Sequence, residues 1–105
     1  MSKLKAAITA VGAYVPDFIL TNKMLEEMVD TNDEWITTRT GIKQRHILKE
    51  EGKGTSFMAI KAAQELLQKS GADPKEIDMV IVATATPDLP VAATAAYVAS
   101  EIGAV

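Results

Sequence analysis

The sequence predicts an α/β fold, and two observations carry that prediction. The run from Met79 to Ala83 is apolar without alternation, which is typical of a strand buried on both faces in a parallel sheet covered by helices. Residues 55–69 instead show apolar side chains at helical spacing. With a first strand and a last helix, the chain has the order strand, helices, strand, helix, which is an α/β pattern.

Two elements are expected before residue 30. Residues 4–13 are predicted to form the first strand, because apolar side chains alternate along them and a Pro-Asp pair follows. A short helix is expected from about residue 23 to residue 29, with Thr21 or Asn22 as its cap.

A second short helix is predicted from a capping box. Thr31 stands at the cap position, and Glu34 follows three residues later, as that pattern requires. The helix ends at Gly41, and residues 42–48 are predicted to form a short strand.

The second half of the chain contains the clearest helix. Thr55 or Ser56 caps it, it runs to about Lys69, and Gly71 ends it. After the apolar strand, a loop over residues 84–90 leads to an alanine-rich helix over residues 92–102.

Composition excludes several classes of protein. The chain has 105 residues, enough for one domain, with 48% hydrophobic and 24% charged residues, as in a globular protein. A net charge of -3 argues against a nucleic-acid binder, which would carry a basic surplus. There is no cysteine and only one histidine, His46, so neither a thiol nucleophile nor a metal site of several histidines is possible here.

The apolar stretches are interpreted as parts of a fold and not as targeting or membrane segments. Residues 6–15 end at a Pro-Asp pair and read better as a strand than as a signal peptide. Residues 79–105 contain Pro87, Asp88 and Pro90, which interrupt any membrane span. We therefore expect a soluble cytoplasmic protein that does not bind a membrane. Because residues 79–105 carry only two charges, we also expect residues 1–105 to be a partial domain of a longer protein.

The main candidate site is a stripe of Thr31, Trp35 and Arg39. Their i, i+4, i+8 spacing places the three side chains on one face of a helix, and Thr40 adds a hydroxyl at the helix end. An indole and a guanidinium can stack on a purine, and the guanidinium can also bind phosphate. From spacing alone, a structural explanation remains the simpler one: a cap, a core tryptophan and a surface ion-pair partner.

Other candidates carry less. The loop of residues 84–90 leaves the carboxyl end of the predicted strand, where α/β sheets bind ligands, although an ordinary strand-to-helix connection is the slightly favoured interpretation. His46 has no neighbouring carboxylate to orient it, so a structural role is expected. The acidic residues near position 30 are interpreted as solvated helix faces and not as a metal site. No glycine motif for phosphate is present.

Three segments resemble a known family. Residues 29–46, VDTNDEWITTRTGIKQRH, resemble the opening signature of the 3-oxoacyl-[acyl-carrier-protein] synthase III family almost throughout. Residues 8–22, ITAVGAYVPDFILTN, resemble the first strand and turn of that family, and residues 82–88, VATATPD, resemble a later strand and loop. The resemblance covers essentially the whole chain but only about the first third of the family's length.

The resemblance implies a thiolase-like fold with layers in the order α-β-α-β-α, of which this chain is the N-terminal part, and a homodimeric parent enzyme. It implies that acetyl-CoA or another acyl-CoA donates an acyl group to a cysteine. That group is then condensed with malonyl-acyl-carrier protein, with loss of carbon dioxide, to start fatty-acid synthesis. A histidine and an asparagine assist the cysteine. No tightly bound cofactor and no metal are expected.

The family's catalytic cysteine, histidine and asparagine do not fall within these residues, and His46 matches the histidine of the signature instead. The resemblance therefore implies no catalytic residue here and an inactive isolated chain. It does imply coenzyme A contacts, with Trp35 near the adenine, Arg39 beside the nucleotide, and Thr31 and Thr40 at the same entrance. Leu89 lies near the family position that closes the acyl pocket. A non-catalytic module that binds CoA or associates with itself is the alternative.

Overall fold

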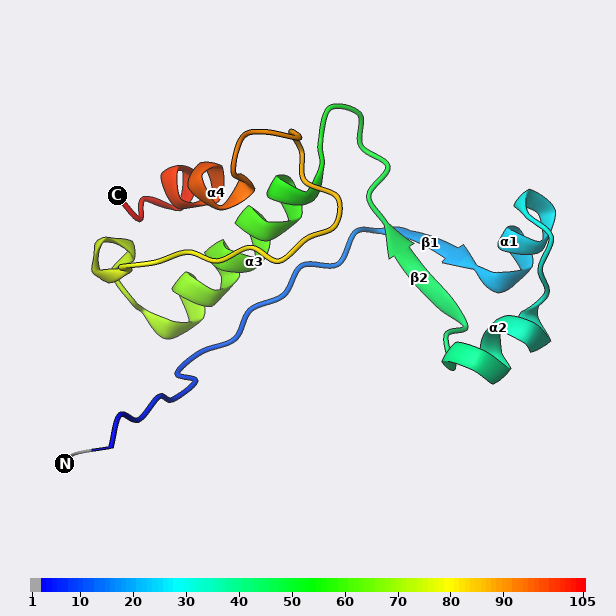
Figure 1. The fold of residues 1–105 in the computed structure, drawn as a ribbon, viewed down its shortest axis with the longest axis horizontal. Coiled ribbons are helices and arrows are strands. Elements are labelled where there is room, and N and C mark those ends of the chain that lie inside the picture. The colour runs from blue at the N-terminus through cyan, green and yellow to red at the C-terminus, as the bar shows by residue number, and fades with distance from the viewer. Residues whose placement is uncertain (1–2) are drawn as a thin grey trace. The chain divides into compact units, whose positions relative to one another are not determined.

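The computed structural model describes residues 3–105, which divide into two compact units (Figure 1). One unit combines the N-terminal segment up to Tyr14 with Gly54–Val105, and the other comprises Val15–Lys53. Each has its own small core, with Val98 buried in the first unit and Ile36 in the second.

The second unit is built on a two-stranded antiparallel sheet. Strand β1 (Phe18–Thr21) pairs with strand β2 (Gln44–Ile47), in a register that places Phe18 opposite Ile47. Strand β2 confirms the strand predicted over residues 42–48. Strand β1 was not predicted, because the Pro-Asp pair before it is typical of the end of a strand and its last residue, Thr21, is typical of a helix cap.

Two short helices lie between these strands in the sequence. Helix α1 (Asn22–Met28) follows Thr21, whose Oγ1 accepts a hydrogen bond from the Met24 N–H at 3.2 Å, as predicted for that cap. Helix α2 (Asp33–Thr40) ends at Gly41, whose φ of 71° is the left-handed conformation that glycine favours.

The capping box predicted at Thr31 is wrong. The N-cap of α2 is Asn32, whose Oδ1 accepts a hydrogen bond from the Trp35 N–H at 2.8 Å. Asparagine is among the best N-cap residues, and Asn32 stands directly before the first helical residue. The helix consequently begins too late for Glu34 to occupy the third position that a capping box requires.

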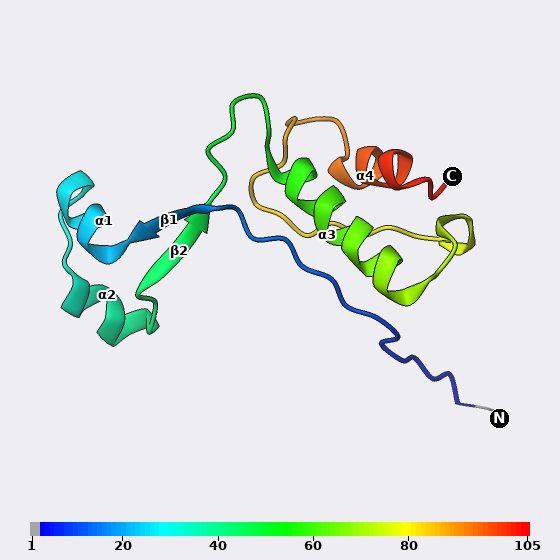
Figure 2. The same cartoon turned by 180° about the vertical axis from the view of Figure 1, so that it is seen from behind.

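The first unit contains the longer helices. Helix α3 (Thr55–Ser70) packs against helix α4 (Thr94–Ile102), with a short 3₁₀ helix, η1 (Pro74–Glu76), between them in the sequence (Figure 2). Both α helices confirm predictions, and α3 ends at Gly71 as expected. The predicted cap of α3 is wrong, because its N-cap is Gly54, which offers no side chain.

The N-terminal segment runs along α3. A Cβ on Gly12 would lie 2.5 Å from the Ala62 carbonyl oxygen, so the two backbones approach too closely for any larger residue. The Ala13 N–H donates to Glu65 Oε2 at 2.6 Å. Two hydrogen bonds lower the pKa of the Glu65 carboxyl: the larger effect comes from Lys69, and the smaller one from the Ala13 N–H.

The two strands predicted for the first unit are absent. Within residues 3–105, neither residues 4–13 nor residues 79–83 pair with a strand, and burial on both faces was also wrong, since Met79 is 76% and Ile81 81% exposed. Residues 80 and 82 are half-buried, so burial alternates along this segment. A strand needs a hydrogen-bonded neighbour, and the described residues supply none to either segment.

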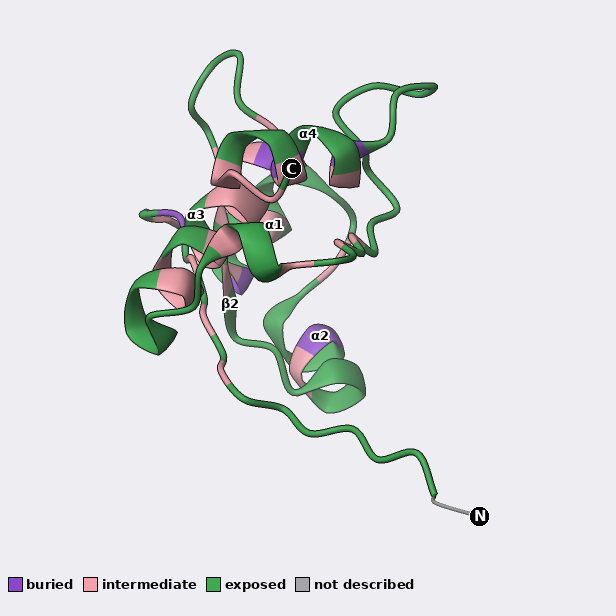
Figure 3. Cartoon of the chain, turned by 90° about the vertical axis from the view of Figure 1, so that its left-hand side faces the viewer, coloured by how far each residue is buried: buried purple, intermediate pink, exposed green. Residues whose placement is uncertain are grey.

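Few side chains are fully buried in the described part of the chain (Figure 3). Ile36 and Val98 are the only hydrophobic residues there with less than 9% exposure, and Asn22, Ser56 and Thr94 are buried polar residues. No helix in residues 3–105 is both long enough and apolar enough to cross a membrane.

Candidate functional site

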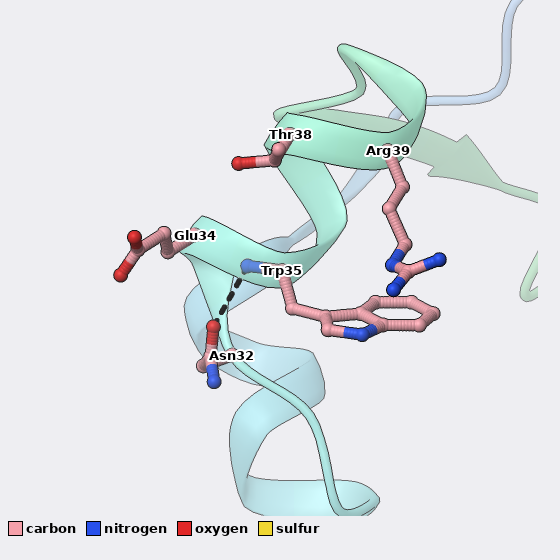
Figure 4. A pocket seen from close by; sticks show the side chains of 5 residues that line it. All are labelled: Asn32, Glu34, Trp35, Thr38 and Arg39. Atoms are coloured by element: carbon pink, nitrogen blue, oxygen red, sulfur yellow. Dashed lines mark hydrogen bonds between the residues drawn. The ribbon is translucent and has the colours of Figure 1, made fainter.

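A shallow hollow of about 310 Å³ lies over helix α2 in the second unit (Figure 4). Its lining residues all come from this helix or its N-cap: Asn32, Glu34, Trp35, Thr38 and Arg39. The hollow is therefore built by one short segment of sequence, which is why spacing along the chain could point to it.

Trp35 and Arg39 form the chemically distinctive part of the hollow. They lie one helical turn apart, and the Arg39 Cζ stands 4.8 Å from the centroid of the Trp35 ring, which places the guanidinium over the indole face. The Trp35 side chain is 53% exposed, so the explanation of a core tryptophan is wrong. The structure thus presents an aromatic plane and a planar cation together at the surface.

The two threonines do not line the hollow. Thr31 precedes the N-cap, so it does not continue the helical face of Trp35 and Arg39, contrary to the expected stripe of three. Thr40 lies in the last turn, where its Oγ1 donates to the Ile36 carbonyl oxygen at 2.7 Å and accepts from the Ile42 N–H at 3.0 Å. Its hydroxyl thereby closes the end of the helix.

Three lining residues were not predicted. Asn32 was not predicted because the capping-box pattern points to Thr31, although asparagine is the stronger cap residue of the two. Thr38 stands three residues after Trp35, a spacing that makes side chains neighbours on a helix. Glu34 was assigned only to the capping box. Helical spacing around Trp35 would have identified Thr38 as a lining residue. Glu34 could be identified only from the structure, which shows that the helix begins at Asp33.

The loop of residues 84–90 is attached to the N-terminus of α3 in the first unit. Asp88 Oδ1 accepts from the Ser56 N–H at 2.7 Å, its Oδ2 accepts from the Ser56 hydroxyl, and the Thr55 hydroxyl donates to the Thr86 carbonyl oxygen at 2.6 Å. The Ser56 hydrogen bonds lower the pKa of the Asp88 carboxyl. Leu89, the next residue along the loop, is 60% exposed.

The remaining candidates have structural explanations. The Nδ1 of His46 lies 2.6 Å from the Pro16 carbonyl oxygen, and since a carbonyl only accepts, this nitrogen carries the proton. One of the acidic side chains near position 30, Glu26, accepts from the Asp33 N–H at 2.8 Å. Among residues 3–105, no group of three histidine, aspartate or glutamate side chains is placed to hold a metal ion.

Comparison with known proteins gives one consistent result. No family model matches the chain. The chain is 58% identical, over 103 residues, to beta-ketoacyl-[acyl-carrier-protein] synthase III 2 of Bacteroides thetaiotaomicron, which covers 98% of this chain and 31% of that protein. It is 57% identical, with the same coverage, to a beta-ketoacyl-[acyl-carrier-protein] synthase III of Porphyromonas gingivalis.

Solved structures agree with the sequence comparison. The 3-oxoacyl-[acyl-carrier-protein] synthase III from Aquifex aeolicus superposes with a TM-score of 0.81 at 46% identity, over 91% of this chain and 30% of that one. The chain thus spans about a third of the length of the relatives that it matches.

Proposed function

We propose, from the premise that this chain belongs to the beta-ketoacyl-[acyl-carrier-protein] synthase III family, that it supplies the nucleotide-contacting face of a condensing enzyme of fatty-acid synthesis. Its fold class is accordingly α/β and thiolase-like. The exposed Trp35 with Arg39 over its ring is the observation that carries this proposal.

The proposed ligand of this face is an acyl-CoA such as acetyl-CoA. An adenine ring can stack on the indole of Trp35, since aromatic planes attract one another in offset contact. The guanidinium of Arg39 can bind a phosphate oxygen of the same nucleotide through charge-assisted hydrogen bonds. Thr31 and Thr40 do not line the hollow itself, and we propose that they line the entrance to the CoA site around it, Thr31 from the segment before α2 and Thr40 from its last turn.

The chain is proposed to act as a partial N-terminal domain of a longer, homodimeric enzyme in the cytoplasm. That enzyme would transfer the acyl group to a cysteine and condense it with malonyl-acyl-carrier protein, releasing carbon dioxide. The chain itself contains no cysteine, so it offers no acceptor for the acyl group. We therefore assign it contacts with the nucleotide and no catalytic residue.

A second candidate is a CoA-binding module without catalysis. The observation that favours it is that all residues lining the hollow over α2 belong to a single unit of 39 residues, Val15–Lys53. The chain also contains no cysteine that could accept an acyl group. The two candidates differ in whether the 105-residue chain binds CoA unaided.

The test is isothermal titration of CoA into the chain and into the longer enzyme. We expect Trp35→Ala and Arg39→Ala each to weaken CoA binding about five- to tenfold, the effect of losing one stacking or charge-assisted contact. Lys23→Ala is the matched control, because it removes one exposed positive charge from α1 in the same unit. Unchanged affinity in both variants would refute the proposed site.

Repeating the titration with CoA lacking its 3′-phosphate separates the two roles. If the guanidinium contacts that phosphate, Arg39→Ala should reduce the affinity for this ligand less than it reduces the affinity for CoA. Trp35→Ala should reduce the affinity for both ligands by the same factor. Saturable binding by the 105-residue chain alone would favour the non-catalytic module, and binding only by the longer enzyme would favour the partial domain.

A further inference from the structure

Asn22 is the most completely hydrogen-bonded side chain in the second unit. It is 2% exposed and is the first residue of α1. Its Nδ2 donates to Asp33 Oδ1 at 2.8 Å and to the Ile42 carbonyl oxygen at 2.8 Å, with Thr37 Oγ1 at 3.4 Å. Its Oδ1 accepts from Arg45 Nη2 at 2.9 Å. One amide therefore connects α1, α2 and β2.

Helix α2 depends on such attachments. It has eight residues, and isolated helices shorter than about 12 residues are marginal in water. Ile36 is its only buried hydrophobic side chain, so little apolar burial holds it in place. Asp33 and Thr37, which contact Asn22, lie one turn apart on the same side of the helix.

The contacts with Asn22 and the candidate site occupy different sides of α2. At about 100° per residue, Trp35 and Arg39 project roughly opposite to Asp33 and Thr37. None of the atoms that Asn22 contacts belongs to either lining residue. Any influence of Asn22 on the hollow must consequently pass through the helix itself.

We propose that Asn22 is a positioning residue for the nucleotide-contacting face. It keeps α2 folded and oriented before the ligand arrives, so that Trp35 and Arg39 are already in place. Apparent affinity falls in proportion to the population of the binding-competent state, so loosening α2 weakens binding without removing any ligand contact. This inference rests on the proposed function for its ligand but not for its structural readout.

The first measurement is the mobility of Trp35, the chain's only tryptophan, by time-resolved fluorescence anisotropy. We expect Asn22→Ala to increase the fast component of the decay while far-UV circular dichroism still shows the helices of the first unit. Gln64→Ala, an exposed amide on α3, is the control and should leave the decay unchanged. An unchanged decay in Asn22→Ala would overturn the proposal, whether or not CoA binds.

The second measurement is CoA affinity in a double-mutant cycle. We expect Asn22→Ala to weaken binding about tenfold and Asp33→Ala to weaken it less. The double variant should lose less affinity than the product of the two single effects, because Asn22 and Asp33 share one hydrogen bond. Multiplied effects in the double variant would overturn the proposal. If Asn22→Ala fails to fold, Thr37→Ala and Asp33→Ala provide milder tests on the same criteria.

The two proposals fail separately. If the unmodified protein does not bind CoA, the proposed function is refuted, while the Trp35 decay still decides whether Asn22 orders α2. If CoA binds and depends on Trp35 and Arg39 but not on Asn22, the nucleotide site stands and the positioning role is refuted.

Discussion

Single side chains decide where the short helices begin. At the start of α2, Thr31 and Asn32 are both good cap residues, and the sequence pattern favoured the first while the backbone uses the second. The choice has a consequence for the site, because it places Asn32 on the rim of the hollow and leaves Thr31 before the helix. A one-residue difference in the cap thus decides which hydroxyl or amide can face a ligand.

This difference can be tested on stability. Asn32→Ala should lower the free energy of unfolding of the second unit by about 1 kcal/mol, since it removes the acceptor of the Trp35 N–H. Thr31→Ala should have a smaller effect. Urea unfolding followed by Trp35 fluorescence measures both, with Asn32→Asp as a control that keeps a capping oxygen. A larger loss of the free energy of unfolding in Thr31→Ala than in Asn32→Ala would instead support a capping box at Thr31.

At the scale of the element, α3 borrows its cap from a distant part of the chain. Its N-cap, Gly54, has no side chain, and Asp88 provides the acceptor for the Ser56 N–H from a loop 32 residues later. A carboxylate at a helix N-terminus also interacts favourably with the helix dipole. The contact therefore stabilises both the helix and the loop that carries Leu89.

The lowered pKa of Asp88 predicts how stability depends on pH. Its carboxylate contributes stability above the ordinary aspartate pKa of about 3.9, and this contribution is lost as the pH falls through the lower pKa of the folded state. Asp88→Asn should reduce the thermal midpoint of the first unit at neutral pH and flatten its decline below about pH 4, as followed by far-UV circular dichroism.

Asp78→Asn is the matched control for this experiment, because it removes the same charge from an exposed position outside the contact with Ser56. Some acid dependence should persist in Asp88→Asn, because Glu65, with its own lowered pKa, is still present. An acid decline as steep in Asp88→Asn as in the unmodified chain would exclude this role for Asp88.

At the scale of the whole molecule, the chain exposes much apolar surface. Leu4 and Ile8 of the N-terminal segment are 103% and 89% exposed, and Met79 and Ile81 are exposed on the second unpaired segment. Monomeric soluble proteins rarely leave extended apolar patches open to water. Segments with unpaired backbone groups are in addition templates for strand addition.

We therefore predict that the 105-residue chain associates with itself as its concentration rises. Sedimentation velocity should show larger species in the micromolar range, and Ile8→Lys with Ile81→Lys should shift the protein toward monomer by placing charges on these segments. Gln68→Lys, on the exposed side of α3, is the control for added charge alone. A monomer at all concentrations would contradict the prediction.

Local sequence was sufficient for the existence of the four α helices and for the centre of the candidate site, but not for the caps of α2 and α3. Gly41 and Gly71 end α2 and α3 where expected, and Trp35 and Arg39 meet because they are four residues apart on one helix. Helical hydrogen bonds join residues four apart, so both the helix and the contacts along its face are encoded within a single turn.

Long-range contacts decided the rest. The apolar runs at residues 4–13 and 79–83 predict strands, yet a strand exists only with a partner, and the described residues pair only β1 with β2. The cap of α3 and the Asn22 network likewise join residues far apart in the sequence. No local pattern encodes such pairings, because their free energy arises only when the chain brings the two groups together.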